Sequence, residues 1–143
     1  MKRILAPILL MTLLFPSIAY GETMDDLVKR DGIHYKKFSD VPFTGKVTGK
    51  THVFLENGQG SLKNGKWDGP WVYYHDNGQL WSKGTYKDGK RVGPWVSYHK
   101  NGQLEFKGTY KNGKWDGPWV DYKEDGTVNE MFTGTYKDGE KVK

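Results

Sequence analysis

Gly69-Pro70-Trp71-Val72 is the stretch that decides the fold, because it returns from Gly93 and again from Gly117, each time 24 residues on. A second motif, Gly-Thr-Tyr-Lys, starts at Gly84, returns after 24 residues, and returns once more after 26. A fixed period of this length is the signature of a repeat architecture, in which each unit buries its apolar side chains against its neighbours. The two additional residues of the last copy are expected to form a bulge near Met131 and Phe132.

Each unit has the pattern of a β-hairpin. Pro94 to His99 is rich in strand-forming residues, and Leu104 to Tyr110 supplies the return strand. Asn101-Gly102 between them predicts a type I′ turn with two positive φ angles, and Asn112-Gly113 predicts the next turn. Helix is excluded from 43–143, because Gly or Pro interrupts every stretch long enough to form one. The sequence therefore predicts an all-β fold, an extended and twisted antiparallel meander of stacked 24-residue hairpins.

The variation between copies predicts which side chains face the core. Residues two apart in a strand share a face, so the constant residues of each unit are assigned to the buried face, Trp included. The position held in turn by Tyr73, Ser97 and Asp121 varies, and we expect it to face solvent. The glycines that begin the second motif are expected to leave room for an aromatic ring of the neighbouring strand, at Gly84, Gly108 and Gly134.

The first 21 residues have the layout of a secretory signal peptide. A basic start at Lys2-Arg3 precedes an apolar run over 4–15 and a small-residue site at Ala19-Tyr20-Gly21. The run is shorter than the roughly 20 residues needed to span a bilayer. Cleavage is predicted between Gly21 and Glu22, and export to the periplasm or outside the cell follows. An uncleaved anchor or a buried N-terminal strand is the alternative interpretation.

The rest of the chain divides into two parts. Residues 22–42 fit no repeat and are predicted to form an N-terminal cap with one strand at 33–37. Residues 43–143 form the predicted repeat array, in which an earlier and degraded unit precedes the copy at Gly69.

Composition excludes several classes of function. The formal net charge of +5 falls to +3 when Lys2 and Arg3 are removed with the leader, and no basic block occurs, so nucleic acid is not a predicted partner. The chain has no Cys, which excludes disulfides, thiol chemistry and Cys-ligated metals.

The polar residues form no catalytic or metal-binding constellation. His75 and His99 are equivalent positions, two strands or roughly 9–10 Å apart, too far to share a metal ion, and we interpret them as surface residues. No serine lies in a nucleophile-elbow pattern. We therefore predict no enzyme activity, no cofactor and no metal.

Aromatic residues outside the constant positions are the candidate binding surface. Trp67 and Trp115 fall in predicted turns, Trp81 aligns with polar residues of other units, and Tyr73 holds the variable position. Exposed aromatic side chains are enriched at binding surfaces. The alternative is that the tryptophans lie over neighbouring units as lids.

The Gly-Pro-Trp-x-x-Tyr, Asn-Gly-x-Leu and Gly-x-Tyr-x-x-Gly elements resemble the MORN repeat in its bacterial variant form, over roughly 43–143. Bacterial proteins with such repeats are often labelled YwqK-type antitoxins. The resemblance implies a twisted sheet of stacked hairpins, binding to proteins, to itself or to phospholipid, and no catalytic residues.

The resulting hypothesis is an exported, non-enzymatic module that binds or scaffolds proteins of the cell envelope. Binding of cell-wall glycan or phospholipid headgroups is one alternative, and an antitoxin or immunity role is another. Unpaired edge strands are expected at both ends of the sheet, and pairing of these edges into a homodimer is a further alternative.

Overall fold

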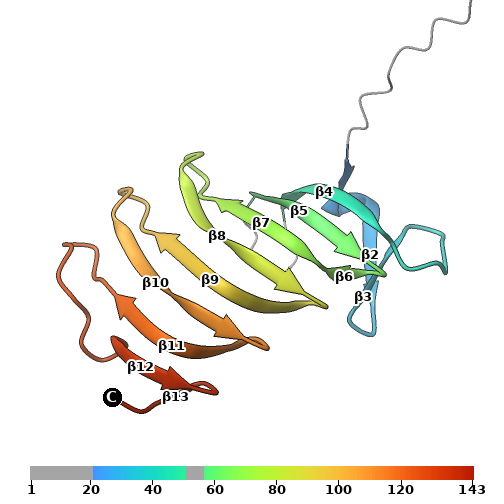
Figure 1. Cartoon of the computed structure of the whole chain (residues 1–143). Coiled ribbons are helices and arrows are strands. Elements are labelled where there is room, and N and C mark those ends of the chain that lie inside the picture. Colours follow the sequence, from blue (N-terminus) through green and yellow to red (C-terminus); the bar gives the residue numbers. More distant parts are fainter. Residues whose placement is uncertain (1–20, 51–56) are drawn as a thin grey trace, which may run out of the picture.

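The computed structural model describes residues 21–50 and 57–143, so all but the last residue of the predicted signal peptide lies outside the described residues. Most of these residues form one long sheet, which is antiparallel from β4 onward and in which strands that follow one another in sequence lie side by side (Figure 1). The sheet strands are β1 (Glu22–Thr23), β4 (Gly45–Lys50), β5 (Asn57–Lys63), β6 (Lys66–Trp67), β7 (Gly69–Tyr74), β8 (Leu80–Lys87), β9 (Lys90–Tyr98), β10 (Leu104–Lys111), β11 (Lys114–Asp121), β12 (Gly134–Lys137) and β13 (Glu140–Lys141). The predicted all-β meander of hairpins is confirmed. No helix in the described part of the chain has the length and apolar character needed to cross a membrane.

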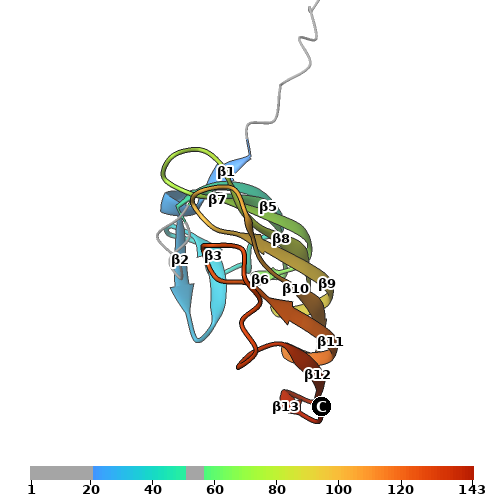
Figure 2. The same cartoon turned by 90° about the vertical axis from the view of Figure 1, so that its left-hand side faces the viewer.

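Residues 22–42 lie beside the first strands of the sheet. Strand β1 adds to β4 in parallel, the single turn η1 (Met24–Asp26) follows, and β2 (Leu27–Arg30) pairs with β3 (Ile33–Lys36) as a separate hairpin. Figure 2 shows this hairpin on one side of the sheet. Backbone hydrogen bonds join it to the array, from the Phe43 amide to the His34 carbonyl and from the His34 amide to the Gly65 carbonyl, both 2.9 Å. The hairpin thus covers the first part of one sheet face.

The turns at one end of the strands differ in type from the turns at the other end. Asp88-Gly89 and Asn112-Gly113 have two positive φ angles each, as a type I′ turn requires. At Asn101-Gly102 only the glycine is positive, so the predicted type I′ turn there is wrong. The Gly102 amide donates to the His99 carbonyl at 2.9 Å, and the Asn101 side chain accepts the Gln103 amide at 2.9 Å. This is a type I turn closed by a left-handed glycine, and the local bond of the Asn side chain favours it.

The tryptophans are buried as predicted, but the facing predicted for the constant valine and for the variable position is wrong. Trp95 is 2% exposed and Ser97 is 1% exposed, whereas Val96, which lies between them in the strand, is half-exposed. Tyr73, at the position of Ser97 one unit earlier, is 1% exposed. Because successive side chains point to opposite faces, a strand that buries its tryptophan also buries the residue two positions on. The variable position is therefore in the core, and the constant valine is outside.

One face of the sheet, here called the aromatic face, carries the rings of the core. It comprises Trp71, Trp95, Trp119, Tyr86, Tyr110 and Tyr136, all buried. The predicted room above glycine is confirmed at two positions. A Cβ on Gly84 would lie 2.1 Å from the Trp95 ring, and one on Gly108 would lie 2.0 Å from the Trp119 ring. At Gly134 it would instead meet the Lys143 carbonyl oxygen at 2.2 Å.

The rings of successive units form a continuous ladder along the aromatic face. Tyr86 meets Trp95 edge-on with centroids 5.2 Å apart, and Tyr110 meets Trp119 in the same way at 5.4 Å. Edge-to-face pairs of this kind add roughly 0.5–1.5 kcal/mol beyond their buried area. The ladder links every repeat to the next. It stabilises a sheet that, among the described residues, has no second layer over most of its length.

Hydrogen bonds across the repeat reinforce the ladder at both ends of the strands. At the Asn-Gly turns, His75 Nε2 lies 2.8 Å from the Tyr98 carbonyl oxygen, and His99 repeats the contact with Tyr122 at 2.8 Å. At the opposite turns, the Gly113 amide donates to the Arg91 carbonyl at 2.9 Å. The histidines thus tie units together, and His75 is buried rather than a surface residue.

The strands at the two edges of the sheet are short, so less of the edge is open than the sequence predicts. Strand β4 pairs with β1 and strand β12 with β13, each only two residues long. Short, charged edge strands leave little backbone for pairing with another chain. The two additional residues of the last unit lie in the 129–133 connection, outside the strands, with Met131 74% and Phe132 41% exposed.

We expect Gly84→Ala to destabilise the fold by about 1–3 kcal/mol, because its methyl group would displace the buried Trp95 ring. The free energy of unfolding in urea measures this cost. Thr85→Ala, on the opposite and exposed face, is the matched control and should change it by no more than about 0.5 kcal/mol. In a Trp95→Ala background the glycine substitution should cost little, and an equal cost there would show that the ring is not the cause.

Tyr73 supplies a prediction of pH dependence. Burial raises the pKa of its phenol well above the usual value, and the hydrogen bond to Tyr86 (3.1 Å between hydroxyl oxygens) adds to the shift. Above pH ~10 the unfolded chain releases this proton while the folded chain keeps it, so stability falls as pH rises, by up to about 1.4 kcal/mol per pH unit. Tyr73→Phe removes this contribution. The stability difference between the two proteins should therefore shrink above pH ~10 in urea titrations, and a constant difference would be inconsistent with a buried phenol.

Candidate functional site

Two of the predicted surface aromatics are core residues. Trp67 is 9% and Tyr73 is 1% exposed, so neither is available to a partner. Trp67 belongs to β6 rather than to a turn, and its ring stacks on Trp71 with centroids 4.8 Å apart. The interpretation of Trp67 and Tyr73 as a binding surface is therefore wrong, because both lie on the face that holds the ring ladder.

The other two predicted aromatics are half-buried against the core. Trp81 meets Tyr73 edge-on at 5.8 Å. Trp115 stacks on Trp119 at 4.3 Å, and its indole nitrogen donates to the Tyr110 hydroxyl at 3.1 Å. Both act as the lids that the alternative interpretation described, while each keeps part of its ring accessible.

Arg91 occupies the position that Trp67 and Trp115 hold in the neighbouring units. Its guanidinium lies 4.5 Å from the centroid of the Trp95 ring and donates to the Tyr110 hydroxyl at 2.9 Å. Burial works against the charge, but the tyrosine hydroxyls outweigh it, so the pKa of Arg91 is raised. A planar guanidinium can stack on a ring as an indole does. Arg91 therefore continues the row of lids and adds a positive charge to this part of the aromatic face.

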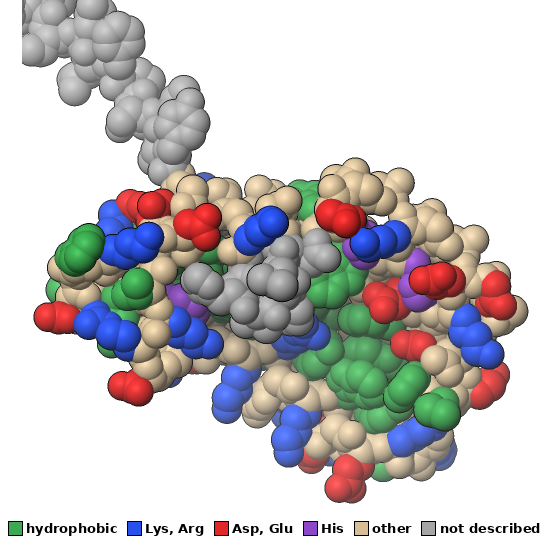
Figure 3. Space-filling view, turned by 180° about the vertical axis from the view of Figure 1, so that it is seen from behind, with side chains coloured by type: hydrophobic (Ala, Val, Ile, Leu, Met, Phe, Trp, Pro, Cys, Tyr) green, Lys and Arg blue, Asp and Glu red, His purple; other side chains and the backbone are tan. Residues whose placement is uncertain are grey.

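The aromatic face is partly open near its C-terminal end. Figure 3 shows hydrophobic side chains gathered on this side of the molecule. The exposed members lie between β11 and β12, with half-buried Phe106 and Trp115 beside the core; they are Val128, Met131 and Phe132. Phe132 meets Trp115 edge-on at 6.5 Å, so the patch continues the ring ladder.

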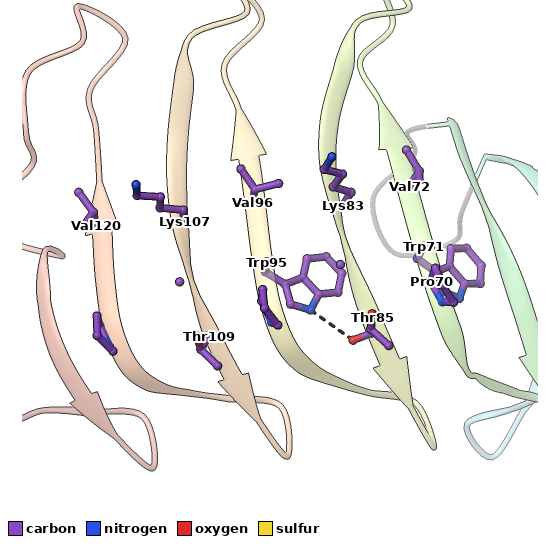
Figure 4. A pocket seen from close by; sticks show the side chains of 14 residues that line it. Pro70, Trp71, Val72, Lys83, Thr85, Trp95, Val96, Lys107, Thr109 and Val120 are labelled. Atoms are coloured by element: carbon purple, nitrogen blue, oxygen red, sulfur yellow. Dashed lines mark hydrogen bonds between the residues drawn. The ribbon is translucent and has the colours of Figure 1, made fainter.

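The opposite face of the sheet, here called the lysine face, is regular, and no segment within 21–50 or 57–143 covers it. Figure 4 shows its side chains in two rows that run across the strands. The upper row alternates valine with lysine, and the lower row alternates proline with threonine. Together the two rows line a shallow trough of about 660 Å³. The residues that line it include Pro70, Val72, Lys83, Thr85, Pro94, Val96, Lys107, Thr109, Pro118 and Val120.

Lysines also pair with one another beside the trough. Lys63 and Lys66, Lys87 and Lys90, and Lys111 and Lys114 stand directly opposite across the type I′ turns. Like charges in directly opposed positions destabilise a sheet. None of these six has an acidic partner within ion-pair distance among the described residues, whereas Lys137 at the fourth turn pairs with Asp116 at 3.2 Å. The lysine face thus carries a large unbalanced positive charge.

A signal for the lysine face was present in the sequence. Lys83 and Lys107 hold the same repeat position, two residues before Thr85 and Thr109. With the tryptophan placed inward, alternation alone puts these residues outward. The residues were missed because valine was assigned to the core on its hydrophobicity, although a residue next to a buried tryptophan in a strand must face the other way.

The polar core residues are occupied by structural bonds. Ser97 Oγ lies 3.1 Å from the Trp81 carbonyl oxygen and 2.5 Å from the Glu105 carboxylate, which share its one proton. Ser82 Oγ donates to the Val96 carbonyl at 3.0 Å. Asp121 on the same face has a raised pKa because of burial. Within residues 21–50 and 57–143, no three His, Asp or Glu side chains are grouped to hold a metal ion.

Comparison with known proteins agrees with the geometry. The MORN repeat variant family matches residues 67–88 and 91–112, which cover the consecutive strands from β6 to β10. None of the curated proteins matches the chain. Repeats of this family generally take part in protein or membrane binding. The sequence period, the stacked hairpins and the matched segments together identify the units at 67–88 and 91–112 as MORN repeats of the variant type.

Proposed function

We propose that the protein is a non-enzymatic docking module that binds a partner protein on the lysine face of its sheet. The observation that carries the proposal is the contrast between the two faces. The aromatic face is filled by its own rings and partly covered by the β2–β3 hairpin, whereas the lysine face repeats one pattern that none of the described residues covers. A rigid array of this kind presents the same side chains at regular intervals, which suits an extended partner.

The chemistry of the described residues supports binding rather than catalysis. The histidines at the Asn-Gly turns contact carbonyl oxygens of the next unit, and the core serines donate to backbone carbonyls. Candidate nucleophiles and bases are therefore engaged in holding repeats together. The contact between Ser97 and the Glu105 carboxylate lies in the core, where Ser97 is 1% exposed and out of reach of a substrate.

We place the module in the cell envelope or outside the cell. This part of the proposal rests on the signal-peptide pattern of residues 1–21. An envelope protein is accordingly the expected partner. An immunity role against a toxin is one form of protein binding, and a toxin gene in the same operon would favour it.

A second candidate function is binding to an anionic membrane surface. The paired lysines at the type I′ turns favour it, since each pair costs stability within the sheet and would gain from a dense negative charge outside it. Basic residues near anionic headgroups contribute on the order of 1 kcal/mol each. Anionic cell-wall glycan would offer the same attraction.

The protein-binding proposal is tested by capture followed by reconstitution. The full chain is immobilised beside Val72→Gln/Val96→Gln/Val120→Gln on the lysine face, and retained envelope proteins are identified, purified and titrated by calorimetry. We expect at least one purified protein to bind the full chain, with Kd raised roughly tenfold or more by the triple substitution. The valines are half-exposed, so the variant should stay folded, as near-UV circular dichroism would check.

The matched control changes the equivalent exposed positions in the Asn-Gly turns, as Gln79→Ala/Gln103→Ala/Thr127→Ala. It should bind as the unmodified chain does. Equal binding by all three proteins would exclude the lysine face, and failure of every captured protein to bind again in purified form would refute the docking role.

The membrane alternative has its own readout. Co-sedimentation with phosphatidylglycerol-containing vesicles, lost in Lys87→Glu/Lys111→Glu and weakened by salt, is expected if lipid is the ligand. An absence of co-sedimentation at low salt would eliminate this candidate.

A further inference from the structure

The trough on the lysine face has a direction and a fixed spacing. Its upper row is set by the register of the sheet, in which Val72 opposes Lys83, Lys83 opposes Val96, and Val96 opposes Lys107. Figure 4 shows these side chains on the same side of the sheet, so the row runs across the strands rather than along them. A ligand in the trough would therefore cross the strands and meet a lysine at every second one.

Lysines flank the trough on both sides. Along β8 the exposed residues on this face are Lys83, Thr85 and Lys87. Strand β10 repeats the order with Lys107, Thr109 and Lys111, of which Thr109 is half-buried. The floor between them is formed by prolines and valines of β7, β9 and β11. A rod-shaped anion in the trough would thus be held between two lines of positive charge over an apolar floor.

The spacing matches one polypeptide conformation. Equivalent lysines lie two strands apart, and at about 4.8 Å per strand this is roughly 9.6 Å. A polyproline II helix has three residues per turn and rises about 3.1 Å per residue, so its every third side chain returns to the same side after roughly 9.3 Å. Carboxylates at every third position of such a segment would meet Lys83 and Lys107, one per turn.

We propose that the trough binds an acidic segment of a partner protein in the polyproline II conformation, laid across the strands with every third residue a carboxylate. The inference rests on the proposed protein-binding function and names the chemistry of the partner. Prolyl rings or aliphatic groups of the segment would cover the floor at Pro94 and Val96, and its carboxylates would pair with Lys83 and Lys107. Thr85 and Thr109 supply hydroxyls for its backbone carbonyls.

Other ligands fit the trough less well. A glycan presents hydroxyls on every side, and the floor offers it few hydrogen-bonding groups beyond the two threonines, so many hydroxyls would lose water without replacement. A lipid surface has no fixed spacing and would use the turn lysines alone. An added β-strand needs an unpaired edge, which β1 and β13 restrict.

Two synthetic peptides of identical composition test the proposal against the full chain by calorimetry. One repeats Pro-Pro-Glu five times, and the other carries its five glutamates in a single block. We expect the regular peptide to bind at least roughly tenfold more tightly, and added salt to weaken it. Lys83→Glu/Lys107→Glu should abolish the preference. The control Lys100→Glu/Lys123→Glu, with the same change of charge at the Asn-Gly turns, should keep it.

Three results would overturn the inference. Equal affinity for both peptides would show that the attraction depends on the total charge and not on the spacing of the carboxylates. Binding to phosphatidylglycerol vesicles through Lys83 and Lys107, without peptide binding, would assign the trough to lipid. No binding of either peptide, while a purified envelope protein still requires the lysine-face valines, would reject the acidic polyproline II segment and leave the docking function intact.

Discussion

The fold depends on a tryptophan ring that lies flat over a glycine of the preceding strand. Trp71 lies over Gly60, Trp95 over Gly84 and Trp119 over Gly108, in each case closer than any added Cβ would permit. This contact fixes which face of each hairpin is buried, and the edge-on tyrosines then extend it from one unit to the next. A single-layer sheet gains little from any one hairpin, so the continuity of the ladder is what stabilises the array.

Much of the fold follows from the sequence. The 24-residue period predicts the meander, and the glycines before Tyr86 and Tyr110 predict the space that a ring fills. The burial of the tryptophans was predicted correctly, but the facing of the valine and of the variable position was predicted wrongly, because constancy among repeats was equated with burial. Val96 is constant although it lies on the outer face. Ser97 varies within the core because neighbouring units fill the space differently, with Phe106 on the next strand where Ser82 stands one unit earlier.

The same inversion relocates the candidate site. Trp67 and Tyr73 serve the core, whereas the lysines and valines that alternate across the strands remain outside. The turn types were predictable only in part. Asn-Gly and Asp-Gly pairs occur at both ends of the strands. The Asn101 side chain accepts a hydrogen bond from the Gln103 amide, and this bond favours a type I turn. The turn type therefore depends on the residue after the dipeptide as well as on the dipeptide. The two ends therefore differ, and the paired lysines gather only at the type I′ end.

The outward orientation of the lysine face is the claim on which the functional account depends, and the absence of cysteine makes it directly measurable. Val96→Cys and Ser97→Cys place a thiol at adjacent positions on opposite faces of β9. Under native conditions, Cys at 96 should react rapidly with a maleimide, and Cys at 97 should react only on unfolding, since Ser97 is 1% exposed. Rapid reaction at 97 with protection at 96 would contradict the account, because it would place the aromatic core on the other side of the sheet.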